Sequence, residues 1–337
     1  MTNDSNSNGW SFFAGIYDTT YIYWPLTLLG SYGSLNNLFV ITILWSQQNA
    51  PQLTILKSLA FSDLSINLTF LALINFPSDY KVPVNFFGNL ACSTFFSIFL
   101  IFALSAVSAW HLVWLTLDLY GGQGEFKWHK YFFVSKLRIR LSIVALWVLG
   151  FLTMNNDLWE YYVDSETQTC FFSWRSDKLR YIVGVEVLVL ILVLPLGIMT
   201  WCYLGLFKTM HDAKKYYELR NNTITSVESD DAYKTTKKFL ISMSVRTSVL
   251  LLVYLVTWTP AIIWLTNVFK ITNDGIFDAW FNNLAELIPI LNAAMNPILY
   301  GWSWFEFRDA VKLKFTNMCC RKTRSRKTRS ENLDLDN

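Results

Sequence analysis

Long apolar segments separated by short polar ones dominate this chain. Seven of these segments contain enough apolar residues to cross a bilayer, which takes about twenty residues as a helix. They run over Ile22–Leu44, Leu53–Phe76, Cys92–Tyr120, Leu141–Met154, Tyr181–Phe207, Phe239–Phe269 and Phe277–Tyr300, the fourth being the shortest. Hydrocarbon offers the backbone no hydrogen-bond partner, so each segment is expected to be helical. The pattern predicts an all-α integral membrane protein built as a bundle of seven transmembrane helices.

Basic residues fall mainly on one side of these predicted helices. The connections 121–140 and 208–238 and the tail segment Arg321–Arg329 are rich in Lys and Arg. The opposite loops hold only Lys81, Arg175, Lys178, Arg180 and Lys270. Because basic loops stay in the cytoplasm, we expect an extracellular N-terminus and a cytoplasmic C-terminus. The predicted location is the plasma membrane, which the chain crosses several times.

The composition agrees with a membrane protein and argues against other classes. Of the 337 residues, 53% are hydrophobic and 16% charged, and the mean hydropathy is +0.30. Soluble domains carry about 25% charged residues. A net charge of +3 is too small to indicate nucleic-acid binding. The chain shows no phosphate loop, no metal-ligand spacing and no nucleophile paired with a base, so no enzyme is expected.

Polar side chains inside a membrane span are costly and usually functional or paired, and five in the predicted spans are singled out. They are Asn37, Asp63, Ser108, Asn292 and Asn296. Asn292 and Asn296 are four residues apart and therefore share one helix face. Together with Asp63 they would offer hard oxygen ligands, which suit a small cation such as sodium. A proton relay and a purely structural hydrogen-bond network are the alternatives.

The predicted topology also bears on cysteines and glycosylation. Cys92 and Cys170 both face the oxidising side, which permits a disulfide, although two free thiols would also be compatible. Asn3 begins an Asn-Asp-Ser sequon on the outside and is the predicted glycosylation site. The sequons at Asn67 and Asn221 fall in a span and on the cytoplasmic side, so neither is expected to be used.

Short motifs occur in order along the predicted helices. They are GSLNNLFVI at 33–41, LAFSDL at 59–64, FGNLAC at 87–92, Trp147, Pro195 followed by Tyr203, TWTP at 257–260 and NPILY at 296–300. The series resembles the rhodopsin-like (class A) family of G-protein-coupled receptors over nearly the whole chain. A single Trp or Pro is weak evidence, whereas NPILY after TWTP, with LAFSD and the Pro–Tyr pair, is specific.

The resemblance implies roles for these residues. Asn37, Asp63 and Asn296 would form the family's central polar network. Its sodium pocket corresponds to Asp63, Ser108, Asn292 and Asn296, beneath Trp258. The implied activation switches are Trp258, the kink at Pro260, Pro195, and the inward-moving tyrosines Tyr203 and Tyr300.

The segment after NPILY has apolar residues at helical spacing between charges. This pattern in WSWFEFRDAVKLKF predicts a short amphipathic eighth helix on the inner leaflet. Cys319 and Cys320 follow it as candidate palmitoylation sites, with unmodified cysteines as the alternative. The expected divisions are an extracellular N-terminus at 1–21, the transmembrane domain at 22–302, the amphipathic helix at 303–318 and a cytoplasmic tail at 319–337.

The third helix departs from the family pattern. Relatives end this helix with Asp/Glu-Arg-Tyr, but here Asp118 and Tyr120 flank Leu119. Leucine cannot form the hydrogen bonds of a guanidinium group, so the efficiency of G-protein coupling is in question. Counted from Cys92, Asp118 lies two residues further along the chain than the family pattern places it. Counting back from Asp118 instead places Ser108 in the sodium pocket. We prefer the second register, which requires an adjustment at the outer end of the helix.

Other positions bear on the ligand. Opsins carry a retinal-binding lysine six residues before the NPxxY asparagine, where this chain has Ile290, so no retinal is expected. Ile101 replaces the aspartate of amine receptors. Glu286 lies ten residues before Asn296, hence about 15 Å further out, and could pair with a cationic ligand or simply face water. Glu186 has the same status.

The second outer loop, 155–174, is acidic and aromatic, which favours a basic or amphipathic peptide ligand but also fits an ordinary solvated surface. We therefore predict a receptor that transmits an extracellular signal to a heterotrimeric G protein. Arrestin and receptor kinases at the Ser/Thr-containing tail, and membrane lipids, are further expected partners. The alternatives are a seven-helix transporter or proton conductor using Asp63 and Glu286, and a receptor-like protein that signals poorly or only through arrestin.

Overall fold

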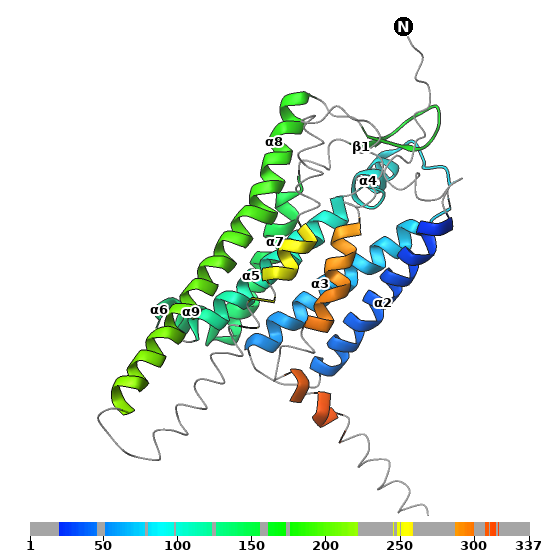
Figure 1. The fold of residues 1–337 in the computed structure, drawn as a ribbon. Helices are drawn as coiled ribbons and strands as arrows, with labels where there is room; N and C mark the ends of the chain where they lie inside the picture. Colours follow the sequence, from blue (N-terminus) through cyan, green and yellow to red (C-terminus); the bar gives the residue numbers. More distant parts are fainter. Residues whose placement is uncertain are drawn as a thin grey trace, which may run out of the picture.

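Long helices lying side by side form most of this computed structural model (Figure 1). It describes residues 20–45, 51–77, 80–97, 99–122, 126–155, 161–172, 176–221, 245, 248–249, 251–258, 287–299, 307–309, 311–314 and 316. The elements up to residue 221 are α2 (Thr20–Trp45), α3 (Pro51–Ile74), α4 (Phe86–Thr94), α5 (Phe99–Gly121), α6 (Lys127–Phe133), α7 (Lys136–Thr153), β1 (Tyr161–Val163), β2 (Cys170–Phe172), α8 (Asp177–Val187), η2 (Leu188–Val193) and α9 (Leu194–Asn221).

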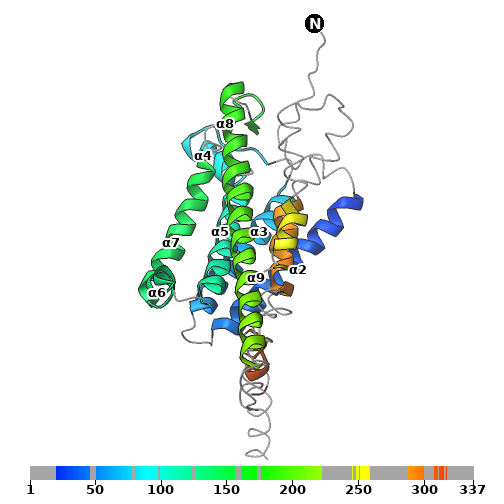
Figure 2. The same ribbon diagram turned by 60° about the vertical axis from the view of Figure 1, so that its left-hand side comes forward.

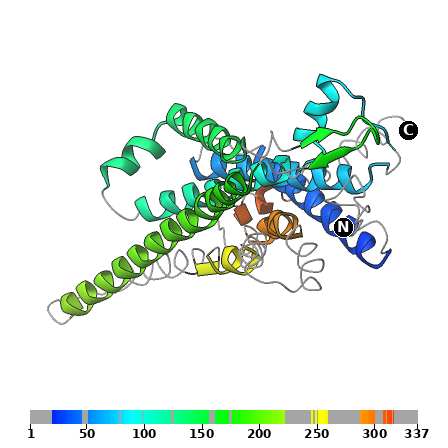
Figure 3. The same cartoon turned by 90° about the horizontal axis from the view of Figure 1, so that it is seen from above.

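Helix α5 lies at the centre of this arrangement. It contacts α3, α7 and α9, while α2 packs along α3. Figure 2 shows α4 at one end of the bundle and α6 at the other. Viewed from above, the continuous rod of α8, η2 and α9 extends past its neighbours (Figure 3). Further helical segments cover residues 251–258 and 287–299.

Polar and apolar residues are distributed as in a membrane protein. Apolar side chains such as Leu28, Leu35 and Leu38 are exposed on α2, whereas Asn37 on the same helix is fully buried. Apolar surface of this extent suits contact with lipid and would be a liability in water. Among the described residues, four helices are long and apolar enough to cross a membrane: Tyr23–Trp45, Leu53–Ile74, Phe99–Gly121 and Ile182–Thr209.

The predicted third span, Cys92–Tyr120, is not one continuous helix. Cys92 belongs to α4, and the chain turns after Thr94 before α5 begins at Phe99. Within the turn, the Phe96 N–H donates to the carbonyl of Ala91 at 3.0 Å. The Ser97 hydroxyl accepts from the Phe99 N–H at 3.1 Å and therefore caps α5. The break lies between Cys92 and Asp118, where the preferred register requires an adjustment.

Three further elements differ from the predicted boundaries. The fourth predicted helix corresponds to α7, which begins at Lys136 instead of Leu141. A short helix, α6, lies in the connection before it. The fifth predicted helix corresponds to α8, η2 and α9, and it continues past Phe207 to Asn221. The fold is also not purely helical, because β1 and β2 form an antiparallel hairpin in which Val163 pairs with Cys170. A helix can extend beyond its apolar segment, so hydropathy alone does not mark where the helix begins and ends.

Candidate functional site

A buried carboxylate lies at the centre of the polar residues predicted to cluster. The Ser108 hydroxyl of α5 donates to one Asp63 carboxylate oxygen at 2.7 Å, and Asn296 Nδ2 donates to the other at 2.8 Å. All three side chains are fully buried. Ser108 therefore lies where the register counted from Asp118 puts it. These bonds connect α3 and α5 with the helix at 287–299.

Two more predicted residues extend this network. Asn37 Nδ2 donates to the carbonyls of Gly33 and Ala293, both at 2.9 Å, which connects α2 to the 287–299 helix. The Thr257 hydroxyl approaches Asn292 Oδ1 at 3.4 Å, which connects the segment 251–258 to the same helix. The five polar residues singled out from the sequence therefore lie in one buried region spanning several helices.

The oxygen atoms of this network are of the kind that small hard cations bind. Asp63 contributes a carboxylate, and Ser108, Asn292 and Asn296 contribute neutral oxygens, a ligand set that hard cations prefer. Asn37 Oδ1 and Asn296 Oδ1 are buried and accept no hydrogen bond from any residue in the described ranges. Buried oxygens of this kind usually have a partner, so these two atoms are suited to a cation or an internal water.

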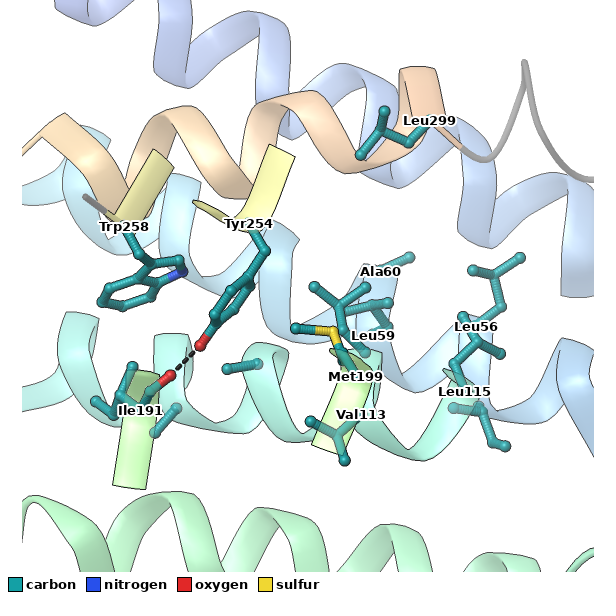
Figure 4. Packing of buried hydrophobic residues seen from close by; sticks show 14 of the residues in the cluster. Leu56, Leu59, Ala60, Val113, Leu115, Ile191, Met199, Tyr254, Trp258 and Leu299 are labelled. Carbon is teal, nitrogen blue, oxygen red and sulfur yellow. Dashed lines mark hydrogen bonds between the residues drawn. The ribbon is translucent and has the colours of Figure 1, made fainter. Parts of the chain in front are cut away.

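Pro195 affects the packing of the fifth helix against the segment that contains Trp258. In an α-helix the carbonyl of Ile191 would accept from the N–H of residue 195, but proline has no N–H. The Tyr254 hydroxyl donates to this carbonyl instead (Figure 4). Tyr254 also lies against Trp258, with ring centroids 5.9 Å apart. The stretch η2 (Leu188–Val193) is a π-helix, an element that occurs frequently at functional sites.

Tyr254 was not among the residues singled out from the sequence. Its only signal was a phenol inside an apolar window, combined with a proline four residues after Ile191 on another helix. Tyr203, which was singled out, is half-buried on α9. Glu186 is half-buried near the end of α8.

At the other end of α5, the atypical motif packs inward. Leu119, at the position of the expected arginine, is 1% exposed. Asp118 Oδ1 lies 2.9 Å from His129 Nε2 of α6. The Tyr120 ring contacts Trp201 of α9, with centroids 5.1 Å apart, and packs so closely on Gly205 that a Cβ there would collide with it. His129 was missed, because nothing in the sequence indicates that α6 folds back onto Asp118.

The hairpin of β1 and β2 is held to α4 by the predicted disulfide. Cys92 and Cys170 are bonded to each other, and both are buried, which confirms that prediction. Hydrogen bonds add to this attachment: the Val163 N–H donates to Asn89 Oδ1 at 2.8 Å, and Lys81 Nζ donates to the Thr167 carbonyl at 2.9 Å. The hairpin is therefore fixed at one end of the bundle by covalent and polar contacts.

The tip of this hairpin carries an acidic side chain. The Thr167 hydroxyl and N–H both donate to one Asp164 carboxylate oxygen, at 2.6 and 2.9 Å. These bonds stabilise the ionised form and lower the pKa of Asp164 below its usual value. The outer loop therefore presents a negative charge near neutral pH.

The remaining residues singled out from the sequence fall outside the described ranges. They are Asn3, Pro260, Glu286, Tyr300, Cys319 and Cys320. In the predicted eighth helix, Phe307 is buried and Lys314 Nζ donates to the carbonyl of Thr42. The described residues there are helical in short runs at 307–309 and 311–314.

Comparison with known proteins identifies the family. Residues 36–300 match the family described as "7 transmembrane receptor (rhodopsin family)". The chain belongs to this family. The solved structure of squid rhodopsin has the same fold, with a TM-score of 0.69 at 18% sequence identity, covering 89% of this chain and 87% of that one. The seven-helix architecture predicted from the sequence is therefore confirmed, and this is a membrane receptor of the rhodopsin family.

Two similar proteins are opsins by name. The receptor is 23% identical to the melanopsin of Branchiostoma belcheri over 69% of its own chain, and 24% identical to the rhodopsin of Procambarus clarkii over 64%. The matches cover 37% of the melanopsin and 57% of the rhodopsin. The receptor thus spans about a third of the length of the melanopsin and somewhat over half of the length of the rhodopsin.

The residue predicted to stand at the retinal-binding lysine position of opsins lies in an apolar setting. This residue, Ile290, has a fully buried side chain. It packs in an apolar cluster with Leu104 and Ala293. A hydrocarbon side chain has no amine, so it cannot form a Schiff base with an aldehyde.

Proposed function

We propose that this receptor transmits the binding of an extracellular, non-covalently held ligand to a heterotrimeric G protein. The observation that carries the proposal is the buried network of Asp63, Ser108 and Asn296, which connects three helices with polar contacts in an apolar setting. Polar contacts of this kind have few alternative partners in lipid, so the bundle has discrete packings. A ligand that binds one packing more tightly than another shifts their populations.

The orientation in this proposal has the N-terminus outside the plasma membrane. It rests on the excess of Lys and Arg in the connections 121–140 and 208–238. The disulfide supports it as well, since Cys92 and Cys170 would then lie on the oxidising side. In the same scheme Asn3 carries a glycan, Cys319 and Cys320 carry palmitate, and arrestin and receptor kinases act on the tail.

The proposed ligand is a cationic or amphipathic peptide. The outer hairpin presents the ionised Asp164 beside the exposed Glu166, and the exposed Tyr162 lies on β1. Opposite charge attracts a basic ligand and speeds its encounter with the receptor. Glu186, near the end of α8, and Glu286 are further candidates to contact it.

Sodium is the proposed allosteric ion, held by Asp63 with Ser108, Asn292 and Asn296. The ion would bind the packing in which these oxygens converge, and ligand binding would be reciprocally weakened by it. The switch residues in this scheme are Trp258, Pro260, Pro195, Tyr203 and Tyr300.

The test is nucleotide exchange on purified G proteins by the receptor in vesicles, with a panel of basic peptides. Exchange stimulated by at least one peptide, and lost when Asp164 and Glu166 are both replaced by the matching amides, is the expected result. Exchange that ignores these substitutions would rule out the acidic loop as the ligand contact. No exchange with any G-protein class would rule out the coupling itself.

Light detection is the second candidate function, favoured by the two opsin relatives. It requires a chromophore held without a lysine at Ile290. Incubation with retinal followed by visible absorption spectroscopy decides this case. We expect no absorption band beyond that of free retinal, and a shifted band together with light-dependent nucleotide exchange would favour light detection.

The buried Leu119 favours a further variant of the proposal, a receptor that binds ligand but activates G protein weakly or acts through arrestin. Replacing Leu119→Arg restores the family's guanidinium at this place. Basal and stimulated exchange should then rise if the missing arginine limits coupling. Unchanged exchange in a folded variant would show that Leu119 does not limit it.

A further inference from the structure

The surface between α6 and α7 combines apolar and basic side chains. On α7, Leu137, Leu141, Val144, Val148 and Leu152 are all exposed and recur every three or four residues. They form one stripe along the helix. Because α7 packs on α5 and α3 with its other face, the stripe is the part of the helix that contacts lipid.

Exposed apolar side chains also occur just before the transmembrane helix. Val134, 70% exposed, and Tyr131, 55% exposed, precede Leu137 at intervals of three residues, and Phe132 beside them is also exposed. Figure 2 shows α6 at the end of α7, on the outside of the bundle. The exposed apolar side chains of α6 therefore lie at the end of α7, where Arg138 of α7 contacts Tyr131.

Contacts on the opposite face fix this orientation of α6. Phe133 is buried and packs against Trp114 of α5, with ring centroids 4.9 Å apart. His129 stacks on Phe133 and contacts Asp118 at 2.9 Å. Since His129 and Phe133 are four residues apart, they define one face of α6 that points toward α5. Tyr131 therefore points outward.

Basic side chains border the exposed surface. The Arg138 guanidinium lies 4.0 Å from the centroid of the Tyr131 ring, and its Nη1 donates to the Tyr131 carbonyl at 2.7 Å. Lys127, Lys130 and Lys136 are exposed nearby. The segment 126–142 contains five Lys or Arg residues and no Asp or Glu. Nothing within this segment neutralises the cations.

From this arrangement we propose that the α6–α7 corner binds anionic phospholipid headgroups of the inner leaflet. The rings of Tyr131 and Phe132 lie at the membrane–water interface, where aromatic side chains are favoured. Arg138, held in place by the Tyr131 ring and carbonyl, and Lys130 contact the lipid phosphate, for which a guanidinium is well suited. This site is separate from the palmitoylated tail and independent of which ligand the receptor binds.

Native mass spectrometry of the full-length receptor, with equal amounts of phosphatidylserine and phosphatidylcholine, tests the proposal. The wild-type receptor should retain phosphatidylserine preferentially. The double variant Lys130→Gln/Arg138→Gln should lose roughly tenfold or more in phosphatidylserine affinity, because each basic residue near an anionic surface contributes severalfold. The matched control Lys208→Gln/Lys215→Gln removes two exposed lysines from α9 and should retain the preference.

A third variant keeps the test valid if the loss of Arg138 perturbs folding. Lys127→Gln/Lys130→Gln/Lys136→Gln alters only exposed side chains and should lower the preference as well, with an unchanged unfolding temperature. Equal phosphatidylserine binding by the wild-type receptor and both corner variants would overturn the proposal. So would a loss of G-protein activation in phosphatidylcholine vesicles with lipid binding unaffected, because the surface would then bind protein.

Discussion

His129 Nε2 lies 2.9 Å from Asp118 Oδ1, so a side chain near the end of α5 contacts a residue of α6 eleven positions further along the chain. Asp118 is buried and His129 is partly buried. With leucine at position 119, no arginine side chain is available next to Asp118. The acidic residue of the motif therefore holds α6 in place.

Replacing His129→Ala should loosen α6. A hydrogen bond to a charged group contributes about 1–2 kcal/mol when partly buried, and its loss affects the short helix first. Hydrogen exchange measured by mass spectrometry should become faster at residues 127–133 and stay unchanged at 136–153. His211→Ala is the control, because His211 and Asp212 are exposed and 3.8 Å apart, where such pairs contribute little. Unchanged exchange in α6 would contradict the assigned contact.

Replacing Tyr254→Phe should destabilise the packing between the fifth helix and the segment 251–258. The change removes the hydroxyl that donates to the Ile191 carbonyl and leaves that carbonyl without its donor. Hydrogen bonds between helices in a membrane contribute about 1 kcal/mol, so the unfolding midpoint in detergent should fall by a few degrees. Tyr162→Phe, at an exposed position on β1, should leave it unchanged.

A double-mutant cycle with Pro195→Ala tests the cause of this effect. Alanine restores a backbone N–H four residues after Ile191 and so supplies a helical donor for the same carbonyl. In that background Tyr254→Phe should cost less stability than in the wild type. Additive costs would mean that the hydroxyl and the proline act independently.

Replacing Asp63→Asn should remove sodium-dependent stabilisation. If sodium binds the proposed site, a concentration ten times its Kd stabilises the folded receptor by roughly 1.4 kcal/mol. The unfolding midpoint should then rise in sodium chloride relative to potassium chloride at the same ionic strength. The rise should vanish in Asp63→Asn and persist in Asp309→Asn, whose carboxylate is exposed. A sodium effect that survives Asp63→Asn would place the ion elsewhere.

Replacing Cys92→Ser should lower stability more than replacing the buried free thiol in Cys202→Ser. The disulfide joins residues 78 positions apart, and in the chain-entropy model a loop of that size contributes about 4 kcal/mol. The unfolding midpoint and the amount of receptor at the cell surface are the measurements. Equal effects of the two substitutions would show that the outer loop is held mainly by its hydrogen bonds, such as that from Val163 to Asn89.

The sequence predicted which residues form the buried network, but not which atoms contact one another. Asp63, Asn292 and Asn296 stood out because amides and carboxylates are rare in apolar windows, and the structure brings them together. The sequence could not show that Asn37 reaches the carbonyl of Ala293. Every residue carries a backbone carbonyl, so such an acceptor leaves no trace in the pattern of residues. The same limitation concealed the contact between Tyr254 and the carbonyl of Ile191.

The sequence by itself determined that the chain is embedded in a membrane, where most helices run and which side chains are polar at their centres. Hydropathy and charge suffice for these conclusions because both are properties of local composition. Only the tertiary structure decided that α4 and α5 are separate helices. Only it joined Asp118 to His129 and placed the Tyr131 ring against the Arg138 guanidinium of α7. These contacts depend on how far each helix is shifted and rotated against its neighbours, which many weak packing interactions set together.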